Sequence, residues 1–302
     1  MILVTGGIAS GKRTFARSLG FADWECAFDV HELAREGESA DALADMLADM
    51  RVVTCAEVGS GIVPLDAGER AWRERVGRLS GELAQRADTV VRMVCGIPVA
   101  LKGPLPLPVQ LVLIRHGRTP GNDERRYVGI VDQPLSDAGR AQAQEAGQHP
   151  EVDRVYVSKL QRTHETAAIM FPNAEQVIVD GIQEMDFGTF AGRSADDMAD
   201  DPQYRAWVDS ECTARCPDGE AQAEFTDRVC AALASLVRQA AERGERQLVV
   251  VAHGGTMMAF LSRYGGDPSK KYWDWLVGNC EGYRIALACC ADDIQVASIA
   301  RW

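Results

Sequence analysis

The sequence predicts an α/β protein of two domains, and three observations support that prediction. Strand-like and helix-like segments alternate along the whole chain, as they do where helices cover a largely parallel sheet. The 302 residues exceed the ~100–200 residues of one ordinary domain. The prolines of 97–108 cannot continue a helix and favour an extended polyproline II linker. We therefore place the boundary near residue 105, with a first domain at 1–105 and a second at 106–302.

The first domain begins with an apolar strand at 2–5, which a glycine-rich turn connects to a helix at 12–19. Apolar side chains recur with helical spacing over 39–50, so an amphipathic helix is expected there. Further along we predict a strand at 51–55, a helix at 69–87 and a strand at 89–94. This alternation predicts a small parallel sheet with helices beside it.

The second domain continues the alternation and predicts a three-layer α/β/α fold. Ser136 is suited to begin a helix, because its hydroxyl can accept a bond from a free backbone N–H of the first turn. The tail at 283–290 and 294–301 predicts a β-hairpin. We expect strands at 109–114, 154–157, 176–179 and 247–252, and helices at 136–148, 162–170, 220–242 and 256–264.

Composition and charge exclude several classes of partner. Hydrophobic residues make up 46% of the chain and charged residues 25%, which is ordinary for a globular protein. The net charge of −12 disfavours nucleic acid and anionic membranes, because both need clustered lysine and arginine. No apolar run approaches the ~20 residues of a membrane span, and the chain begins without a secretory signal. We expect a cytoplasmic protein that binds neither nucleic acid nor membrane.

The nine cysteines are an odd number and are scattered, which indicates free thiols in a reducing compartment. Cys212 and Cys216 form a CxxxC pair, but no histidine or second pair lies near them at zinc-binding spacing. We therefore expect no metal site. Trp273 and Trp275 alternate in a strand-like or loop stretch and are expected in the core rather than stacked on a ligand.

The glycine-rich turn is a candidate nucleotide site. Its sequence from Gly6 to Thr14, GGIASGKRT, nearly fits the phosphate-binding loop GxxxxGK[ST] between a strand and a helix. If the loop functions, its cofactor would be GTP or ATP with Mg²⁺. Arg13 stands where a hydroxyl would hold Mg²⁺, so a tight glycine turn without a ligand is the alternative. The candidate nucleotide-binding residues are Gly6, Gly7, Ser10, Gly11, Lys12 and Thr14.

Together with this loop, Glu57-Val58-Gly59-Ser60-Gly61-Ile62-Val63-Pro64 and Gly96-Ile97-Pro98 resemble the adenosylcobinamide kinase/guanylyltransferase family over 1–103. That family carries its guanylylated histidine in a long stretch after the first helix, where this chain has only residues 20–50. His31 is the one histidine there, and we expect it at the surface. The resemblance implies a shortened relative without kinase or guanylyl transfer activity. The family forms oligomers through its helices, so residues 69–87 are a candidate for homo-oligomer contacts.

A second candidate site begins where the strand at 109–114 ends. Arg115, His116 and Gly117 follow that strand directly, and α/β folds build sites at the carboxyl ends of parallel strands. A neutral imidazole can attack phosphorus and split ester hydrolysis into two easier steps. An arginine beside it can bind phosphate oxygens with two parallel hydrogen bonds.

Further motifs follow in order along the chain. They are Thr119-Pro120-Gly121-Asn122, Pro134-Leu135-Ser136-Asp137, Ser158-Lys159-Leu160-Gln161-Arg162, Glu184-Met185-Asp186-Phe187-Gly188, Pro217-Asp218-Gly219-Glu220 and Ala252-His253-Gly254-Gly255. With Arg115-His116-Gly117 they resemble the histidine phosphatase (phosphoglycerate mutase-like) superfamily over 109–302.

The resemblance implies roles for these residues. His116 would be the nucleophile, and Glu184 would protonate the leaving oxygen and then activate water, with Asp186 as an alternative carboxylate. Arg115, Arg162 and His253 would stabilise the phosphoryl charge. The candidate phosphate- or substrate-binding residues are Asn122, Gly117, Arg118 and Gly254, with Ser158 as a further contact. This mechanism needs no cofactor.

The acid loop at 184–192 is most similar to α-ribazole-5′-phosphate phosphatases, which act in the same cobalamin nucleotide-loop assembly as the family that the first domain resembles. We therefore expect a small phosphate ester as substrate, α-ribazole 5′-phosphate or cobalamin 5′-phosphate. One alternative is a phosphatase of other or many small esters. Two others give the first domain a role, as a nucleotide-sensing scaffold or as the second activity of a bifunctional enzyme.

Overall fold

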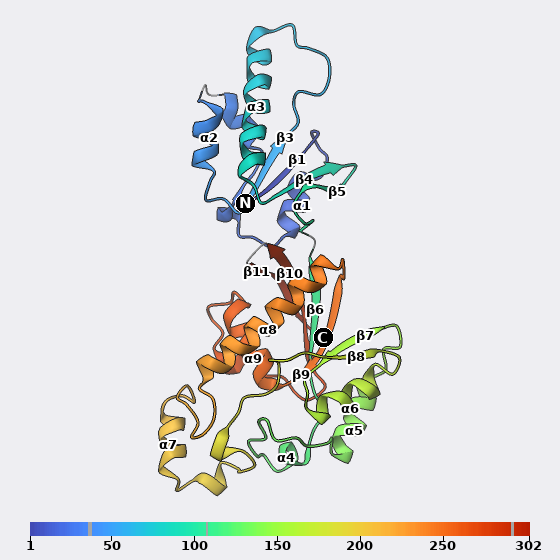
Figure 1. The fold of residues 1–302 in the computed structure, drawn as a ribbon, viewed down its shortest axis with the longest axis vertical. Coiled ribbons are helices and arrows are strands. Elements are labelled where there is room, and N and C mark those ends of the chain that lie inside the picture. Colours follow the sequence, from blue (N-terminus) through green and yellow to red (C-terminus); the bar gives the residue numbers. More distant parts are fainter. Residues whose placement is uncertain (36–37, 107, 291–292) are drawn as a thin grey trace. The chain divides into compact units, whose positions relative to one another are not determined.

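The computed structural model describes residues 1–35, 38–106, 108–290 and 293–302 (Figure 1). The chain divides into two compact units, Met1–Pro108 with Leu287–Ala297 and Val109–Ala286 with Ser298–Trp302. The domain boundary near residue 105 stays a prediction. Each unit is described by itself below.

The first unit contains a five-stranded sheet in the order β2-β3-β1-β4-β5. Strand β1 (Ile2–Gly6) lies between β3 (Val52–Ala56) and β4 (Thr89–Val94) and is parallel to both. The short β2 (Cys26–Ala27) pairs parallel with β3. The helices are α1 (Lys12–Ser18), α2 (Ala40–Met46) and α3 (Ala67–Arg86), with 3₁₀ turns at Asp23–Glu25 and Val30–Arg35.

Alternate residues of β1 face two different cores, as the period of two along a strand requires. Leu3 packs with apolar side chains of α2 and α3, including Leu43 and Leu79. Ile2 and Val4 pack on the opposite face with Phe15 and Leu19, which follow the glycine-rich loop. The first three residues of the strand, Ile2, Leu3 and Val4, are therefore all apolar because both of its faces are buried.

The predicted linker at 97–108 is wrong in its first half. Residues Ile97–Lys102 form β5, which pairs antiparallel with β4 at the edge of the sheet. Cys95 and Gly96 both have positive φ, +52° and +79°, as a tight two-residue hairpin turn requires. An edge strand tolerates Pro98, because one side of the strand needs no ladder bond. Leu107 lies outside the described residues.

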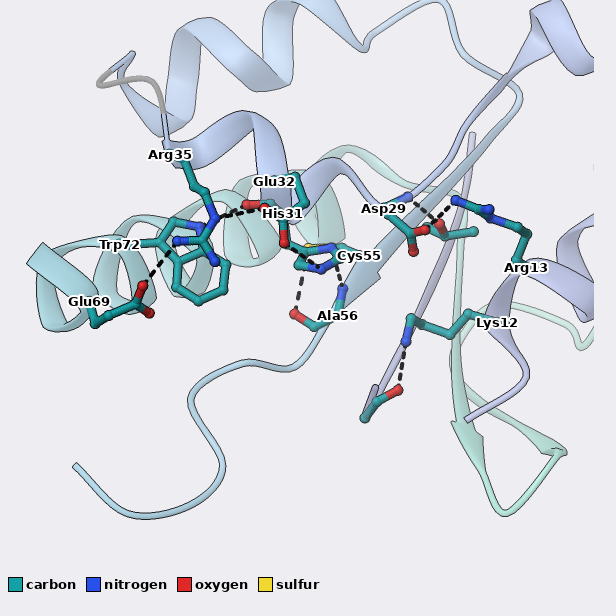
Figure 2. Close-up of polar contacts among 12 residues, drawn as sticks. Lys12, Arg13, Asp29, His31, Glu32, Arg35, Cys55, Ala56, Glu69 and Trp72 are labelled. Atoms are coloured by element: carbon teal, nitrogen blue, oxygen red, sulfur yellow. Dashed lines mark hydrogen bonds and ion pairs between the residues drawn. The ribbon is translucent and has the colours of Figure 1, made fainter. Parts of the chain in front are cut away.

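Two further expectations for the first unit are wrong. The helix predicted to 50 ends at Met46, although Leu47 and Met50 still pack on the core after it, which explains why the apolar spacing continued. His31 is not at the surface, since only 8% of it is exposed. Its Nδ1 accepts a bond from the Ala56 N–H at 3.4 Å, and its carbonyl oxygen accepts from Trp72 Nε1 at 3.0 Å (Figure 2).

The second unit contains most of a six-stranded sheet in the order β11-β10-β6-β9-β7-β8, while Leu287–Ala297 of β10 and β11 are counted with the first unit. Strands β6 (Val109–Arg115), β9 (Gln247–Ala252), β7 (Arg154–Val157) and β8 (Glu175–Ile178) run parallel. Strands β10 (Gly282–Cys290) and β11 (Asp293–Arg301) are neighbours, while residues 291–292 of the predicted hairpin turn lie outside the described residues.

Helices lie around this sheet, as the predicted α/β class requires. Ala143 and Met170 come from α5 and α6 and pack on apolar side chains of β6, β7 and β9, whereas α8 and α9 contact β6. The prediction missed α4 and α7. The helices are α4 (Pro120–Asp123), α5 (Asp137–Glu145), α6 (Gln161–Met170), α7 (Pro202–Asp209), α8 (Gln222–Glu242) and α9 (Gly254–Tyr264).

The parallel register of β6 and β9 decides where the candidate site lies. Arg115 is the register partner of Ala252, so the residues that follow these two strands emerge side by side. These residues are His116 and His253, and the end of β7 supplies the segment that leads to Arg162. Within the described part of the chain, no helix is both long and apolar enough to cross a membrane.

Candidate active site

His116 is buried, with 4% of it exposed, and its two ring nitrogens have different partners. Nδ1 lies 2.6 Å from the carbonyl oxygen of Gly117. Because a carbonyl can only accept, this contact assigns the ring proton to Nδ1. Nε2 is then the unprotonated nitrogen, and it accepts a bond from Arg162 Nε at 3.2 Å. The nitrogen that carries the free electron pair therefore faces the arginine.

Arg162 connects the two histidines that follow β6 and β9. Its Nε lies 3.2 Å from His116 Nε2 and 3.3 Å from His253 Nδ1. The other guanidinium nitrogens donate to the carbonyl oxygens of Val131 and Gly129 at 2.9 and 2.6 Å. These bonds fix the plane of a side chain that is 1% exposed.

His253 is fully buried, and its Nε2 lies 2.8 Å from Ser158 Oγ. Its ring is 5.2 Å from that of His116, edge to face. Burial, together with the positive charge of Arg162, holds the pKa of both histidines well below the usual value near 6.5. Burial also lowers the pKa of Arg162 to about 10, which leaves this arginine charged at neutral pH. The pocket thus combines neutral imidazoles with a permanent cation.

Arg115 supplies a second cation. Its Nη1 donates to the carbonyl oxygen of Val277 at 2.7 Å, while its buried Nε has no partner among the described residues. Burial lowers its pKa, and the charge of Glu184 opposes that effect. A Cβ on Gly254 would lie 3.4 Å from this Nε, so glycine keeps the space beside the guanidinium open. An unpaired buried N–H of this kind is a ready donor for an anion.

Glu184 is held by the first turn of α9. Its Oε2 accepts from the Gly255 N–H at 3.1 Å, and its Oε1 accepts from the Met185 N–H at 3.0 Å. A Cβ on Gly255 would overlap Oε1, so only glycine lets the carboxylate come this close. The positive end of the helix favours a carboxylate at this point. Asp186 differs, since its Oδ1 accepts from the Gly188 N–H inside its own loop.

The four predicted binding residues have different surroundings. Asn122 Oδ1 accepts from the Thr119 N–H at 3.2 Å and from Asn279 Nδ2 at 3.5 Å. Arg118 is ion-paired with Asp123 at 2.7 Å and is 45% exposed, so the structure does not place it in the buried cluster. We expected Gly117 to allow close approach of a ligand. A Cβ added at Gly117 would lie 2.9 Å from the carbonyl oxygen of Gly139, so the glycine lets these two backbone segments pack together.

Asn279 is part of the site and was not predicted. Its Nδ2 donates to the His116 carbonyl at 2.8 Å, and its own carbonyl accepts from Gln142. It lies 163 residues from His116 in a loop before β10, where no local pattern marks it. Trp275 is buried as expected, whereas Trp273 is 49% exposed, and both belong to a 3₁₀ turn rather than a strand.

Residues 111–295, more than half of the chain, match the model of the histidine phosphatase superfamily (branch 1). The chain belongs to the histidine phosphatase superfamily. This confirms the predicted family and enzyme class, so the protein is a phosphatase.

Relatives of this histidine phosphatase carry several names. "Probable phosphoglycerate mutase GpmB" of Citrobacter koseri is 32% identical over 184 residues, which cover 59% of this chain and 84% of the relative. The crystal structure of the α-ribazole phosphatase of Shigella flexneri shares 26% identity at a TM-score of 0.52, over 62% of this chain and 94% of that one. A mycobacterial glucosyl-3-phosphoglycerate phosphatase, complexed with VO₃, shares 25% identity at a TM-score of 0.52, over 64% and 98%.

In the glycine-rich loop of the first unit, the lysine expected to bind a nucleotide is bonded to the loop itself (Figure 2). Lys12 is buried, and its Nζ donates back to the loop's own carbonyls, to Gly6 at 3.1 Å and Gly7 at 2.6 Å. Burial lowers the pKa of Lys12. Gly11 has φ +95° and begins α1, while the buried Ser10 Oγ has no partner among the described residues.

These residues do not fit a Mg²⁺-bound nucleotide. Arg13 takes the place of the metal-binding hydroxyl and forms an ion pair with Asp29 (Figure 2). Thr14 is exposed on α1. Among the residues that the structure describes, no group of three or more His, Cys, Asp or Glu could hold a metal ion.

Residues 25–101 match the model of the family cobinamide kinase / cobinamide phosphate guanyltransferase. The predicted resemblance of the first domain is thereby confirmed over these residues. The match begins after the glycine-rich loop, so it leaves Gly6, Gly7, Ser10, Gly11 and Lys12 outside.

Proposed function

We propose that the phosphatase acts through a phosphohistidine on His116. Nε2 attacks phosphorus, and the bond from phosphorus to the leaving alcohol oxygen breaks. Water then attacks the same phosphorus, the N–P bond breaks, and phosphate leaves. The unprotonated Nε2 supports this proposal, because the bond from Nδ1 to the Gly117 carbonyl holds the reactive tautomer before substrate arrives.

The charge that develops on the phosphoryl oxygens needs donors that are already in place. Arg162 and the unpaired Nε of Arg115 are suited to this role. His253 Nδ1 accepts from Arg162 and so holds this guanidinium in place, while Asn122 is linked to the His116 carbonyl through Asn279. All of these groups belong to the protein, so the proposed steps need no cofactor.

Glu184 is proposed as general acid and then general base. Its carboxyl gives a proton to the leaving alcohol oxygen in the first step and takes one from water in the second. We prefer it to Asp186 because the charge of Glu184 acts on both Arg115 and Arg162, whereas Asp186 bonds the Gly188 N–H of its own loop. The bonds from Gly255 and Met185 hold Glu184 in one orientation for both transfers.

We propose α-ribazole 5′-phosphate, or cobalamin 5′-phosphate, as substrate. The observation that carries this step is the match of residues 25–101 to the cobinamide kinase family in the same chain. The α-ribazole phosphatase of Shigella flexneri is also among the similar structures. A phosphatase of other small esters is the alternative. Cytoplasmic location and self-association through α3 stay predictions.

The test compares kcat/KM for α-ribazole 5′-phosphate with a sugar phosphate, a nucleotide and 3-phosphoglycerate. We expect the ribazole ester to be preferred by at least about 10-fold, and His116→Ala to abolish phosphate release from every ester. His164→Ala is the control, because His164 bonds Gln176 away from the cluster. Turnover of the other esters alone, still lost in His116→Ala, would keep the mechanism and reject the substrate.

A further inference from the structure

A cavity of about 100 Å³ in the second unit has Glu184 and Gly255 in its wall. Most of the remaining wall is aromatic, from Tyr127, Phe187, Trp207, Phe225, Tyr272 and Trp273. We call this the aromatic cavity. Because Glu184 lines it, the cavity lies beside the proposed acid.

The aromatic wall is held in place by contacts between its own rings. Tyr127 packs edge to face against Phe187 at 5.2 Å and against Trp207 at 5.7 Å. The Tyr127 hydroxyl lies 2.9 Å from that of Tyr204, which anchors the ring from behind. A wall with these contacts loses little entropy when a ligand packs on it.

The charge of the cavity limits what can enter. Among the described residues that line it, Glu184 is the only charged one, and neither lysine nor arginine is present. A second carboxylate or phosphate on the substrate would lose its water here without gaining a cation. Burial and the charge of Glu184 raise the pKa of Tyr272, and the same two effects oppose a further negative charge on a ligand here.

We propose that the aromatic cavity is the leaving-group subsite and selects phosphate monoesters whose alcohol carries a flat aromatic group. The inference rests on the proposed role of Glu184, since atoms bonded to the leaving oxygen must then extend along this wall. An engineered cavity of roughly 150 Å³ binds benzene. At about 100 Å³ the aromatic cavity takes part of one ring, and the half-exposed Trp273 offers a face for the rest. Esters with a second anionic group, such as phosphoglycerate, are disfavoured.

The first test uses three esters of alcohols with similar leaving oxygens: 2-phenylethyl phosphate, butyl phosphate and 3-phosphoglycerate. We expect kcat/KM for the phenylethyl ester to exceed both others by at least about 10-fold. Equal values for phenylethyl and butyl phosphate would overturn the inference but leave the phosphohistidine mechanism standing. Failure to hydrolyse the phenylethyl ester while α-ribazole 5′-phosphate is still turned over would overturn the inference alone, and failure on all four esters would overturn both.

Two variants test the wall itself. Trp273→Ala should raise KM for phenylethyl phosphate about 10-fold, and by more than KM for butyl phosphate, because only the aromatic ester packs on the ring. Trp24→Ala is the matched control, since Trp24 is an exposed tryptophan of the first unit. Gln222→Lys adds a cation to the cavity and should raise kcat/KM for 3-phosphoglycerate relative to phenylethyl phosphate. An unchanged ester ratio in both variants would reject the subsite, and this ratio does not depend on the folded fraction.

Discussion

The tautomer of His116 determines which of its ring nitrogens can react. The Gly117 carbonyl holds the proton on Nδ1, and Arg162 faces the free pair on Nε2. Arg162 is one cation between two neutral rings, so protonation of either histidine would place like charges in contact. Neutral histidines and a charged arginine are therefore one electrostatic unit that is suited to an anionic phosphoryl group.

This cluster of two histidines and one arginine makes the free energy of unfolding depend on pH. The pKa of His116 and of His253 is lowered in the folded state, so the unfolded chain binds more protons below pH 6.5. The stabilising contribution is complete above that pH and is lost as the pH falls. We expect each histidine to remove about 1.4 kcal/mol from the free energy of unfolding at pH 5.5. Urea unfolding at pH 7.5 and 5.5 should show a smaller loss in His116→Asn than in the wild type. Equal losses of unfolding free energy in the two proteins would contradict a buried neutral His116.

At the level of elements, the first turn of α9 brings three functional groups together. His253 precedes the helix, Gly254 leaves space beside Arg115, and the Gly255 N–H binds Glu184. Two glycines are needed here because Arg115 packs against Gly254 and Glu184 packs against Gly255. The helix therefore positions the proposed acid and the proposed phosphate-binding cation with one backbone segment.

Gly255→Ala tests this arrangement. The new Cβ would overlap Glu184 Oε1 and push the carboxylate from its place, so we expect kcat to fall about 100-fold with a smaller change in KM. Gly77→Ala is a matched control, because Gly77 lies inside helix α3 with no heavy atom within 4 Å of an added Cβ. Wild-type kcat in Gly255→Ala would argue against Glu184 as the acid held by α9.

At the level of the whole molecule, the chain carries a net charge of −12, yet its candidate active site is cationic. Arg115 and Arg162, which we propose bind phosphate, lie in the second unit, where burial in a low dielectric strengthens their effect. The first unit keeps a phosphate-loop sequence whose lysine is bonded to its own carbonyls. The two units thus differ in whether their cations are available to a ligand.

Isothermal titration of the full chain with GTP or ATP in the presence of Mg²⁺ tests that difference. We expect no measurable heat, because Arg13 replaces the metal-binding hydroxyl and is paired with Asp29. Micromolar binding that Lys12→Ala abolishes would show a working loop and restore the nucleotide-sensing alternative. A first unit that binds no nucleotide would leave its family resemblance as a guide to substrate only.

Local sequence patterns determined the fold class and the family of this protein. The α/β class, most strands and helices and the family followed from periodicity, glycine placement and short motifs, because these reflect interactions between near neighbours. Tertiary structure alone decided that 97–102 is an edge strand, that His31 is buried and that Asn279 supports His116. It also decided the tautomer of His116 and the aromatic cavity beside Glu184. These features depend on contacts between residues far apart in the chain, which strand register and packing bring together and which no local pattern encodes.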